Sequence, residues 1–162
     1  MTSAINAARW LCRFYYERNS KRISEMVLHK LLYFSQREAL IADADSPLFP
    51  EPFEAWKYGP VLCAIRASFS EISNSSEGDF EELSNDDEKA IKSALDRYSG
   101  IDPWGLVNLT HGESSWINAR NGCGPGDRCR NEITVEAIRI DAERIRCRRR
   151  LLDERRRLSG RA

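Results

Sequence analysis

The chain has 162 residues, a length that suits one domain, and 41% of them are apolar, which excludes wholesale disorder. Basic and acidic residues balance at 25 each, so the chain as a whole is neither a polycation nor a polyanion. No run approaches the roughly 20 consecutive apolar residues of a membrane span, and the first residues lack the pattern of an export signal, so we expect a cytoplasmic protein without a membrane partner.

The charge is nevertheless unevenly distributed along the chain. Residues 71–88 contain eight acids and no lysine or arginine, whereas residues 139–162 contain ten arginines and four acids. Opposed blocks of this kind either steer a charged partner or simply face water.

The first 42 residues predict two helices. Ser3 is a suitable N-cap for a helix over 3–18, and Ser24 for a second helix that ends near residue 42. The apolar positions of the second helix recur at helical spacing, and Tyr33 widens this stripe, so we expect a central helix packed on more than one side. The stripe consists of Leu28, Leu31, Leu32, Ser35 and Ala39.

The next segment predicts a connection, an extended stretch and a third helix. Residues 43–52 carry two prolines and several turn formers, so they connect elements, and residues 53–58 look extended. Gly59 permits backbone conformations that other residues avoid, and Pro60 is suited to the first turn of a helix. We therefore predict a helix over 60–70.

The second half of the chain predicts a surface loop and four further helices. The loop covers the acidic stretch 73–83, and three helices follow at about 85–98, 103–109 and 115–121. The proposed N-caps include Ser84, Asp102 and, for the last helix, Thr134.

The last helix loses its apolar stripe where the arginine run begins. The stripe runs from Val135 to Ile145, but the next position on it is Arg149. We expect the final turns, 146–157, to project beyond the core or to fray.

Together these elements predict a mainly α fold, a compact single-domain globule of about six helices with a short extended segment near 53–58. The folded domain would occupy residues 1–140. Residues 141–162 would form an Arg-rich C-terminal helical extension.

Five cysteines in a chain without an export signal favour reduced thiols over a disulfide framework. Cys123 and Cys129, with His111 upstream, invite a zinc interpretation, but their spacing is longer than usual and no fourth ligand is evident. The loop 124–128 also lacks the Gly-Lys-Ser/Thr ending of a phosphate-binding loop. We therefore predict no metal and no cofactor.

An aromatic turn is the strongest candidate for a binding surface. Trp56 and Tyr58 flank a tight corner at Gly59 and Pro60, and such rings bury apolar area while they keep a polar group. Glu54, two residues before Trp56, would lie on the same side as a charge at the rim. The alternative is that both rings attach the turn to the core.

Lys30 is a second candidate, because it lies among apolar residues on the second predicted helix. Its side chain could extend along the apolar surface and place the charge at the rim. The functional alternative is contact with an acidic partner.

The loop after the helix at 103–109 contains a third candidate group. His111 could act as a base with Glu113 as its orienting carboxylate and Ser114 as a nucleophile. Because these residues share one loop and no oxyanion-hole pattern is evident, we favour a structural His111 that bonds a backbone carbonyl or Lys57.

Three signatures in this order resemble the Panacea, or SocA-like, antitoxin domain family. The resemblance covers roughly residues 7–140 and leaves the arginine-rich tail outside, and Ser115 stands where the family has proline. The signatures are Lys30-Leu31-Leu32-Tyr33-Phe34, Trp56-Lys57-Tyr58-Gly59-Pro60-Val61 and Thr110-His111-Gly112-Glu113-Ser114-Ser115-Trp116.

The resemblance implies a binding protein and not an enzyme: an antitoxin that neutralises a toxin encoded beside it. It would act by direct binding, or as an adaptor that presents the toxin to a cellular protease. By the same resemblance and the arguments above, the partner-binding residues are Lys30, Tyr33, Glu54, Trp56, Tyr58, Gly59, Pro60, Thr110, His111 and Trp116.

Two other functions remain as alternatives. One is a His-dependent hydrolase built on His111. The other is a nucleic-acid-binding regulator, because arginines supply phosphate contacts well. The tail lacks interleaved aromatic residues and no helix-turn-helix is evident, so nucleic acid would be a secondary partner. Its contacts would be Arg148, Arg149, Arg150, Arg155, Arg156 and Arg157.

Overall fold

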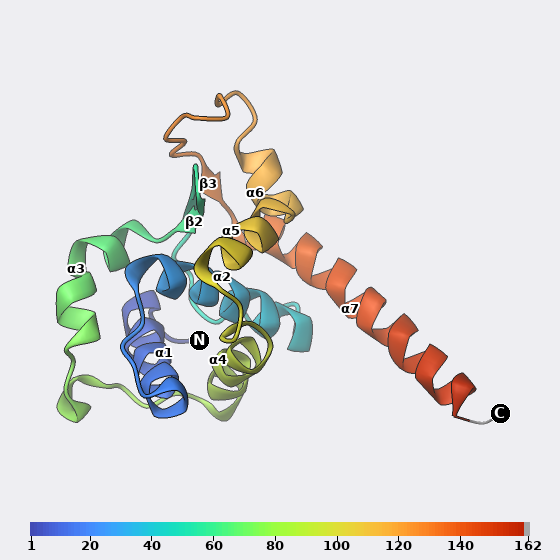
Figure 1. The fold of residues 1–162 in the computed structure, drawn as a ribbon, viewed down its shortest axis with the longest axis horizontal. Coiled ribbons are helices and arrows are strands. Elements are labelled where there is room, and N and C mark those ends of the chain that lie inside the picture. The colour runs from blue at the N-terminus through green and yellow to red at the C-terminus, as the bar shows by residue number, and fades with distance from the viewer. Residues whose placement is uncertain (161–162) are drawn as a thin grey trace.

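A computed structural model describes residues 1–160 and shows a helical body around one central helix, with a small sheet at one side (Figure 1). The predicted mainly α fold is confirmed. The helices are α1 (Ala4–Asn19), α2 (Glu25–Ala42), α3 (Cys63–Ser73), α4 (Asn85–Tyr98), α5 (Pro103–His111), α6 (Ser114–Ala119) and α7 (Val135–Ser159), and a 3₁₀ turn, η1, spans Glu77–Asp79.

Five helices begin at the N-caps that the sequence predicts. In each case the side-chain oxygen of the cap accepts the backbone N–H of the residue three positions later, which satisfies a donor that the helix leaves without a partner. These caps are Ser3, Ser24, Ser84, Asp102 and Thr134.

The central helix α2 is covered on several sides. Every residue from Val27 to Leu40 is buried, and α2 packs against α1, α4, α5 and α7. The apolar stripe supplies most of the core, but the same stretch also buries Lys30, Arg37 and Glu38. Buried charged groups need partners. Their partners lie on other elements, so these three residues connect α2 to the hairpin, to the loop before α6 and to α7.

The extended segment is a β-hairpin and not a single strand. β1 (Phe53–Trp56) pairs antiparallel with β2 (Gly59–Val61), and the two-residue β3 (Glu132–Ile133) pairs with the other side of β1. The predicted helix start at Pro60 is therefore wrong, because Pro60 lies in β2 and α3 begins at Cys63. β2 is an edge strand, where proline is tolerated.

The loop between α6 and β3 corrects the prediction for the cysteines. Cys123 and Cys129 form a disulfide, with their Cα atoms 5.9 Å apart. The Arg120 side chain donates to the backbone oxygens of Gly124 and Asp127 and so holds the loop in the conformation that brings the two cysteines together. The expectation of reduced thiols is wrong for this pair, and neither sulfur is available as a thiolate ligand for zinc.

The helix α7 begins on the body and then leaves it (Figure 1). It is attached by Arg146, whose side chain donates to the backbone oxygens of Leu40 and Ile41, and by Arg149, which forms two hydrogen bonds to Glu38. Residues 150–160 are all exposed. Of the two expected outcomes, projection or fraying, the structure shows projection, as one continuous helix that reaches Ser159.

Within residues 1–160, no helix is both long and apolar enough to cross a membrane.

Candidate functional site

The hairpin turn lies directly on the central helix, and Gly59 is packed tightly against Lys30. A Cβ atom at Gly59 would lie 2.5 Å from Oγ1 of Thr110 and 2.8 Å from Cε of Lys30, and the residue has a φ of 103°. Both the space and the backbone conformation therefore require glycine. This contact brings together α2, the hairpin and α5, which carry the first signature, the second signature and the start of the third.

Lys30 is buried under the hairpin, so its side chain does not extend to the rim. Its Nζ donates a hydrogen bond of 3.1 Å to the backbone oxygen of Pro60, and the side chain is almost inaccessible. Burial lowers the pKa of Lys30 from 10.5 to about 7, because the charged amine loses its hydration. Lys30 therefore supports the turn from below.

His29, the preceding residue, fixes the end of the hairpin. Its Nδ1 accepts the backbone N–H of Leu62, and burial is the main reason that its pKa falls to about 3. The ring is thus neutral near pH 7. Its Nε2 is buried, has no hydrogen-bond partner among the described residues, and lies 3.5 Å from a carboxylate oxygen of Glu25.

Trp56 is held between an acid and two cations. Its Nε1 donates to Glu54 at 2.6 Å, as expected from the same-side placement of these residues. The guanidinium carbons of Arg66 and Arg128 lie 5.0 Å and 3.9 Å from the Trp56 ring centre. Contacts of this kind are cation–π interactions, which are stronger when they are shielded from water. Neither arginine was a candidate from the sequence, because α3 and the disulfide-closed loop supply them.

Tyr58 is the exposed ring at the tip of the turn. Its side chain is 45% exposed, and it meets the 57% exposed Trp104 edge-on, with ring centres 5.5 Å apart. The Nζ of Lys57 lies 5.0 Å from the Tyr58 ring centre. Trp104 was not predicted as a site residue, because only the fold places the start of α5 beside the turn. We call Trp56, Tyr58 and Trp104, with Lys57, Arg66 and Arg128, the aromatic face.

Residues of the third signature contact the backbone of the hairpin turn. His111 stacks on Trp116 with ring centres 4.1 Å apart, and its Nε2 lies 3.0 Å from the backbone oxygen of Lys57. Trp116 Nε1 donates to the backbone oxygen of Trp56 at 2.9 Å. The expected contact of His111 with a backbone carbonyl is confirmed. Burial is also the main reason that the pKa of His111 is lower than usual.

The other polar residues of this signature bond elsewhere. Glu113 pairs with the buried Arg37, and Ser114 donates to Asp141 through both its backbone N–H and its hydroxyl. Burial raises the pKa of Glu113, although Arg37 opposes that shift. The carboxylate and hydroxyl that a hydrolase would need beside His111 are therefore engaged in another cluster.

Tyr33 lies at the centre of that cluster. Its hydroxyl is 2.7 Å from the Ser115 hydroxyl, 3.3 Å from a carboxylate oxygen of Asp141 and 3.2 Å from one of Glu113, and its single proton can point at only one of them at a time. The Ser115 backbone N–H also donates to Asp141 at 2.8 Å. Proline, which the resemblance leads us to expect at this position, has no N–H to donate. The departure from the signature thus adds a bond that ties α6 to α7.

Asp141 completes the cluster from α7. Burial by itself raises the pKa of Asp141, but hydrogen bonds from Ser114 and Ser115 outweigh that effect, and the pKa is lower than usual. Its carboxylate is therefore ionised near neutral pH. The cluster connects the central helix, the third signature and the base of α7.

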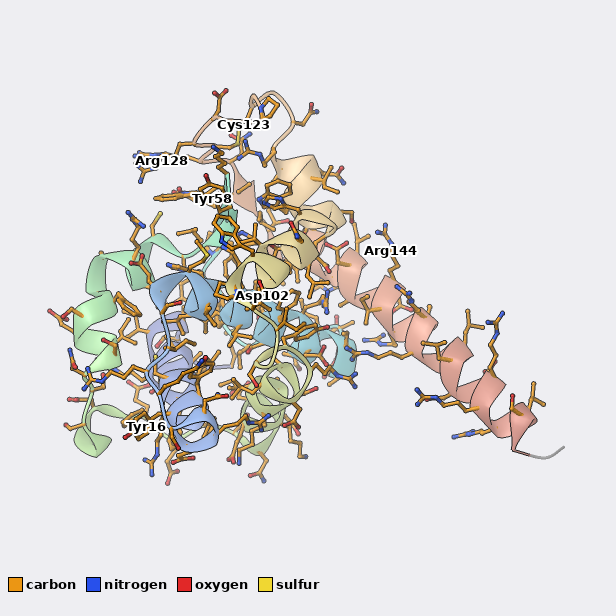
Figure 2. The ribbon with its side chains drawn as sticks, viewed as in Figure 1. Tyr16, Tyr58, Asp102, Cys123, Arg128 and Arg144 are labelled. Carbon is orange, nitrogen blue, oxygen red and sulfur yellow. A yellow bond between two sulfur atoms is a disulfide. The ribbon has the colours of Figure 1, made fainter. Side chains whose placement is uncertain are left out.

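A pocket of about 380 Å³ opens between the hairpin and the first turns of α2. Figure 2 shows Tyr58, Arg128 and Cys123 at the same end of the molecule, where the disulfide-closed loop overhangs the hairpin. The pocket has a largely apolar wall and a basic rim. The lining includes Met26, His29, Lys30, Trp56, Tyr58 and Arg128.

The predicted partner-binding residues thus form two layers. The residues of the buried layer are almost inaccessible to solvent, whereas the outer layer is at least partly exposed. The buried layer consists of Lys30, Tyr33, Gly59, Pro60 and Thr110, and the outer layer of Glu54, Trp56, Tyr58, His111 and Trp116.

The arginines of the tail also differ from one another. Arg149 is engaged with Glu38, and these hydrogen bonds outweigh burial, so the pKa of Glu38 is lower than usual. The other five predicted nucleic-acid contacts are exposed on α7. They are Arg148, Arg150, Arg155, Arg156 and Arg157.

The fold and this site define a small helical protein that presents an aromatic surface on a rigid support. The family model of the SocA-like antitoxin, Panacea domain matches residues 28–117, which include all three signatures. The match covers more than half of the chain, so the chain belongs to the SocA-like Panacea antitoxin domain family. Neither a curated protein nor a solved structure matched the chain.

Proposed function

We propose that this protein is an antitoxin that neutralises its toxin by direct binding through the aromatic face. The observation that supports the surface is the exposure of Tyr58 and Trp104, 45% and 57%, beside the partly exposed Trp56. Tryptophan, tyrosine and arginine are the residues that most often dominate binding energy at protein interfaces. Family membership supports the class of partner.

Hydrogen bonds from residues of both layers and from His29 give this surface a fixed shape. Lys30 and His29 hold the two sides of β2, and His111 and Trp116 hold the backbone at Lys57 and Trp56. A surface that is rigid before binding loses little conformational entropy on association. The rings would therefore enter pockets of the toxin without rearrangement of the hairpin.

The charges of the aromatic face indicate the chemistry of its partner. Lys57, Arg66 and Arg128 surround the rings, whereas Glu54 is already paired with Trp56. Complementary charge raises association rates and disfavours partners of the same sign. We infer that the toxin presents an acidic surface around apolar pockets.

Growth rescue followed by recovery of a complex tests this proposal. Cells would express each flanking reading frame alone and together with this protein. Relief of toxicity and a stable complex in the rescued cells is the expected result. Rescue without any complex would contradict neutralisation by binding.

A second step after binding would be delivery of the toxin to a protease. Toxin half-life in the rescued cells distinguishes the two outcomes. An unchanged half-life indicates occlusion alone, whereas a shorter half-life that depends on the antitoxin indicates an adaptor.

Nucleic-acid binding is a second candidate, supported by the exposed arginines of α7. If they contact phosphates, binding to duplex DNA should weaken steeply with salt, and Arg155→Gln with Arg156→Gln should reduce that dependence by about two charges. Binding that is unaffected by this change would exclude α7 as the contact.

A further inference from the structure

The projecting helix α7 carries a second apolar stripe that faces away from the body. Ile140, Leu151 and Leu158 are 62%, 61% and 70% exposed, and Cys147 between them is also exposed. Residues two positions apart differ by about 200° around a helix. Because Ile138 is buried in the core, Ile140 lies on nearly the opposite side of α7.

The outward stripe has the spacing of a coiled-coil seam. Steps of four and three residues alternate along it, which is the pattern of the two core positions of a heptad. Two charged residues interrupt the apolar ones, and they have opposite signs. In order, the seam consists of Ile140, Arg144, Cys147, Leu151, Glu154 and Leu158.

We propose that α7 pairs along this seam with α7 of a second copy of the chain, in antiparallel orientation. In that register each layer of the helix pair places an a position of one helix opposite a d position of the other. Ile140 meets the partner's Leu158, Arg144 meets the partner's Glu154, and Cys147 meets the partner's Leu151. The twofold axis of the dimer makes each of these three pairs occur twice. Every residue of the seam therefore has a partner on the second helix.

Charge selects the antiparallel orientation. A parallel pair in register would place Arg144 against its own copy and Glu154 against its own copy, and like charges in the seam are unfavourable. The antiparallel pair joins these opposite charges twice. Beside the seam it also places Glu143 near the partner's Arg157.

The body does not obstruct this pairing. The side of α7 that contacts the body carries Ile138, Ala142 and Arg149, and the seam lies on the other side. Figure 2 shows Arg144 pointing outward from α7, away from the body. In the dimer the two bodies would lie on opposite sides of the helix pair, which spans about 27 Å from Ile140 to Leu158.

The dimer should be weak. Near the twofold axis, Arg148 and Arg150 each approach their own copies, and only four side chains of the seam on each helix are apolar or sulfur-containing. An interface of this size is below the range of stable assemblies. We expect a dissociation constant on the order of micromolar, independent of any toxin.

Sedimentation velocity over a series of concentrations tests the proposal. The intact chain should shift from monomer to dimer, and Leu151→Asp should raise the dissociation constant about tenfold or more, because it places a carboxylate in the seam. Leu152→Asp is the matched control, since Leu152 is 46% exposed but lies one position away from the seam. Circular dichroism would show that both variants remain helical.

A charge exchange tests the register. Arg144→Glu and Glu154→Arg should each weaken the dimer, because each places like charges in two layers. The double variant should recover most of the lost affinity, because it restores opposite charges in the reversed order. Loss in both single variants without recovery in the double variant would overturn the antiparallel register.

Two results would overturn the dimer itself. One is an intact chain that stays monomeric at its highest soluble concentration. The other is a dimer that Leu151→Asp and Leu152→Asp affect equally, because such a dimer would not use the seam.

Discussion

The buried layer and the aromatic face differ in how their residues are held. Tyr33 and Lys30 have direct partners inside the body, and almost none of their surface is exposed. Tyr58 and Trp104 contact each other and leave about half of their surface open. The family signatures therefore contain both residues that shape the surface and residues that can touch a partner.

This difference separates two kinds of defect. A change in the buried layer should reduce stability, and it should affect binding only through the loss of the fold. A change on the aromatic face should reduce binding while the free energy of unfolding stays nearly constant.

Removal of Glu113 should be the most destructive single change. Glu113→Ala leaves the buried Arg37 guanidinium without its carboxylate, and loss of one member of a buried ion pair costs about 3–5 kcal/mol. Chemical denaturation measures this loss. Glu113→Gln keeps a hydrogen-bonding group and should lose less. Equal stability of Glu113→Ala and the unaltered chain would show that the cluster is not structural.

Removal of the rings should abolish rescue and leave the fold intact. Trp56→Ala with Tyr58→Ala should weaken toxin binding about a hundredfold or more, because such anchors dominate interface energies. Tyr16→Ala is the matched control, since Tyr16 is a 56% exposed ring on α1 and lies at the other end of the body from Tyr58 (Figure 2). Isothermal titration calorimetry would measure the affinities.

Lys30 should make stability depend on pH above neutrality. Its pKa is about 7 when folded and 10.5 when unperturbed, so the unfolded chain binds more protons within that window. The free energy of unfolding should therefore rise with pH from about 7 to 9.5, and Lys30→Met should flatten the slope. Urea titrations at several pH values measure it. An equal slope in the variant would contradict the burial of a neutral amine.

Substitution of Arg128 should have the smallest effect of the four predicted changes. Its guanidinium lies over Trp56, and a partly exposed cation–π contact contributes about 0.5–1 kcal/mol. Arg128→Gln should weaken toxin binding by about fivefold or less, with little change in stability. Toxin affinity measured after reduction of the Cys123–Cys129 disulfide can be compared with that of Arg128→Gln, because reduction loosens the loop that carries Arg128.

The helices could be predicted well because their signals are local. The helix α4 has the predicted bounds, and Ser84, Asp102 and Thr134 cap helices as expected. The signal at Pro60 was ambiguous, because proline suits both the first turn of a helix and an edge strand. Pairing of Pro60 with β1 decides in favour of the edge strand, and a local sequence pattern does not show which strand a residue pairs with.

The site was predictable only in part for the same reason. Trp56 and Tyr58 stand out in the sequence because they are large rings at a tight turn. Trp104 and Arg66 come from other elements and become part of the surface only after folding. The sequence also could not show that Lys30 is buried, because its environment depends on the hairpin that covers it.

The most direct test of the central claim is toxin affinity measured beside folding stability for the double ring variant. If the aromatic face binds the toxin, Trp56→Ala with Tyr58→Ala should lose about a hundredfold or more in affinity, whereas its urea midpoint should stay close to that of Tyr16→Ala. Full toxin binding by the folded double variant would contradict the assignment of the aromatic face as the toxin-binding surface.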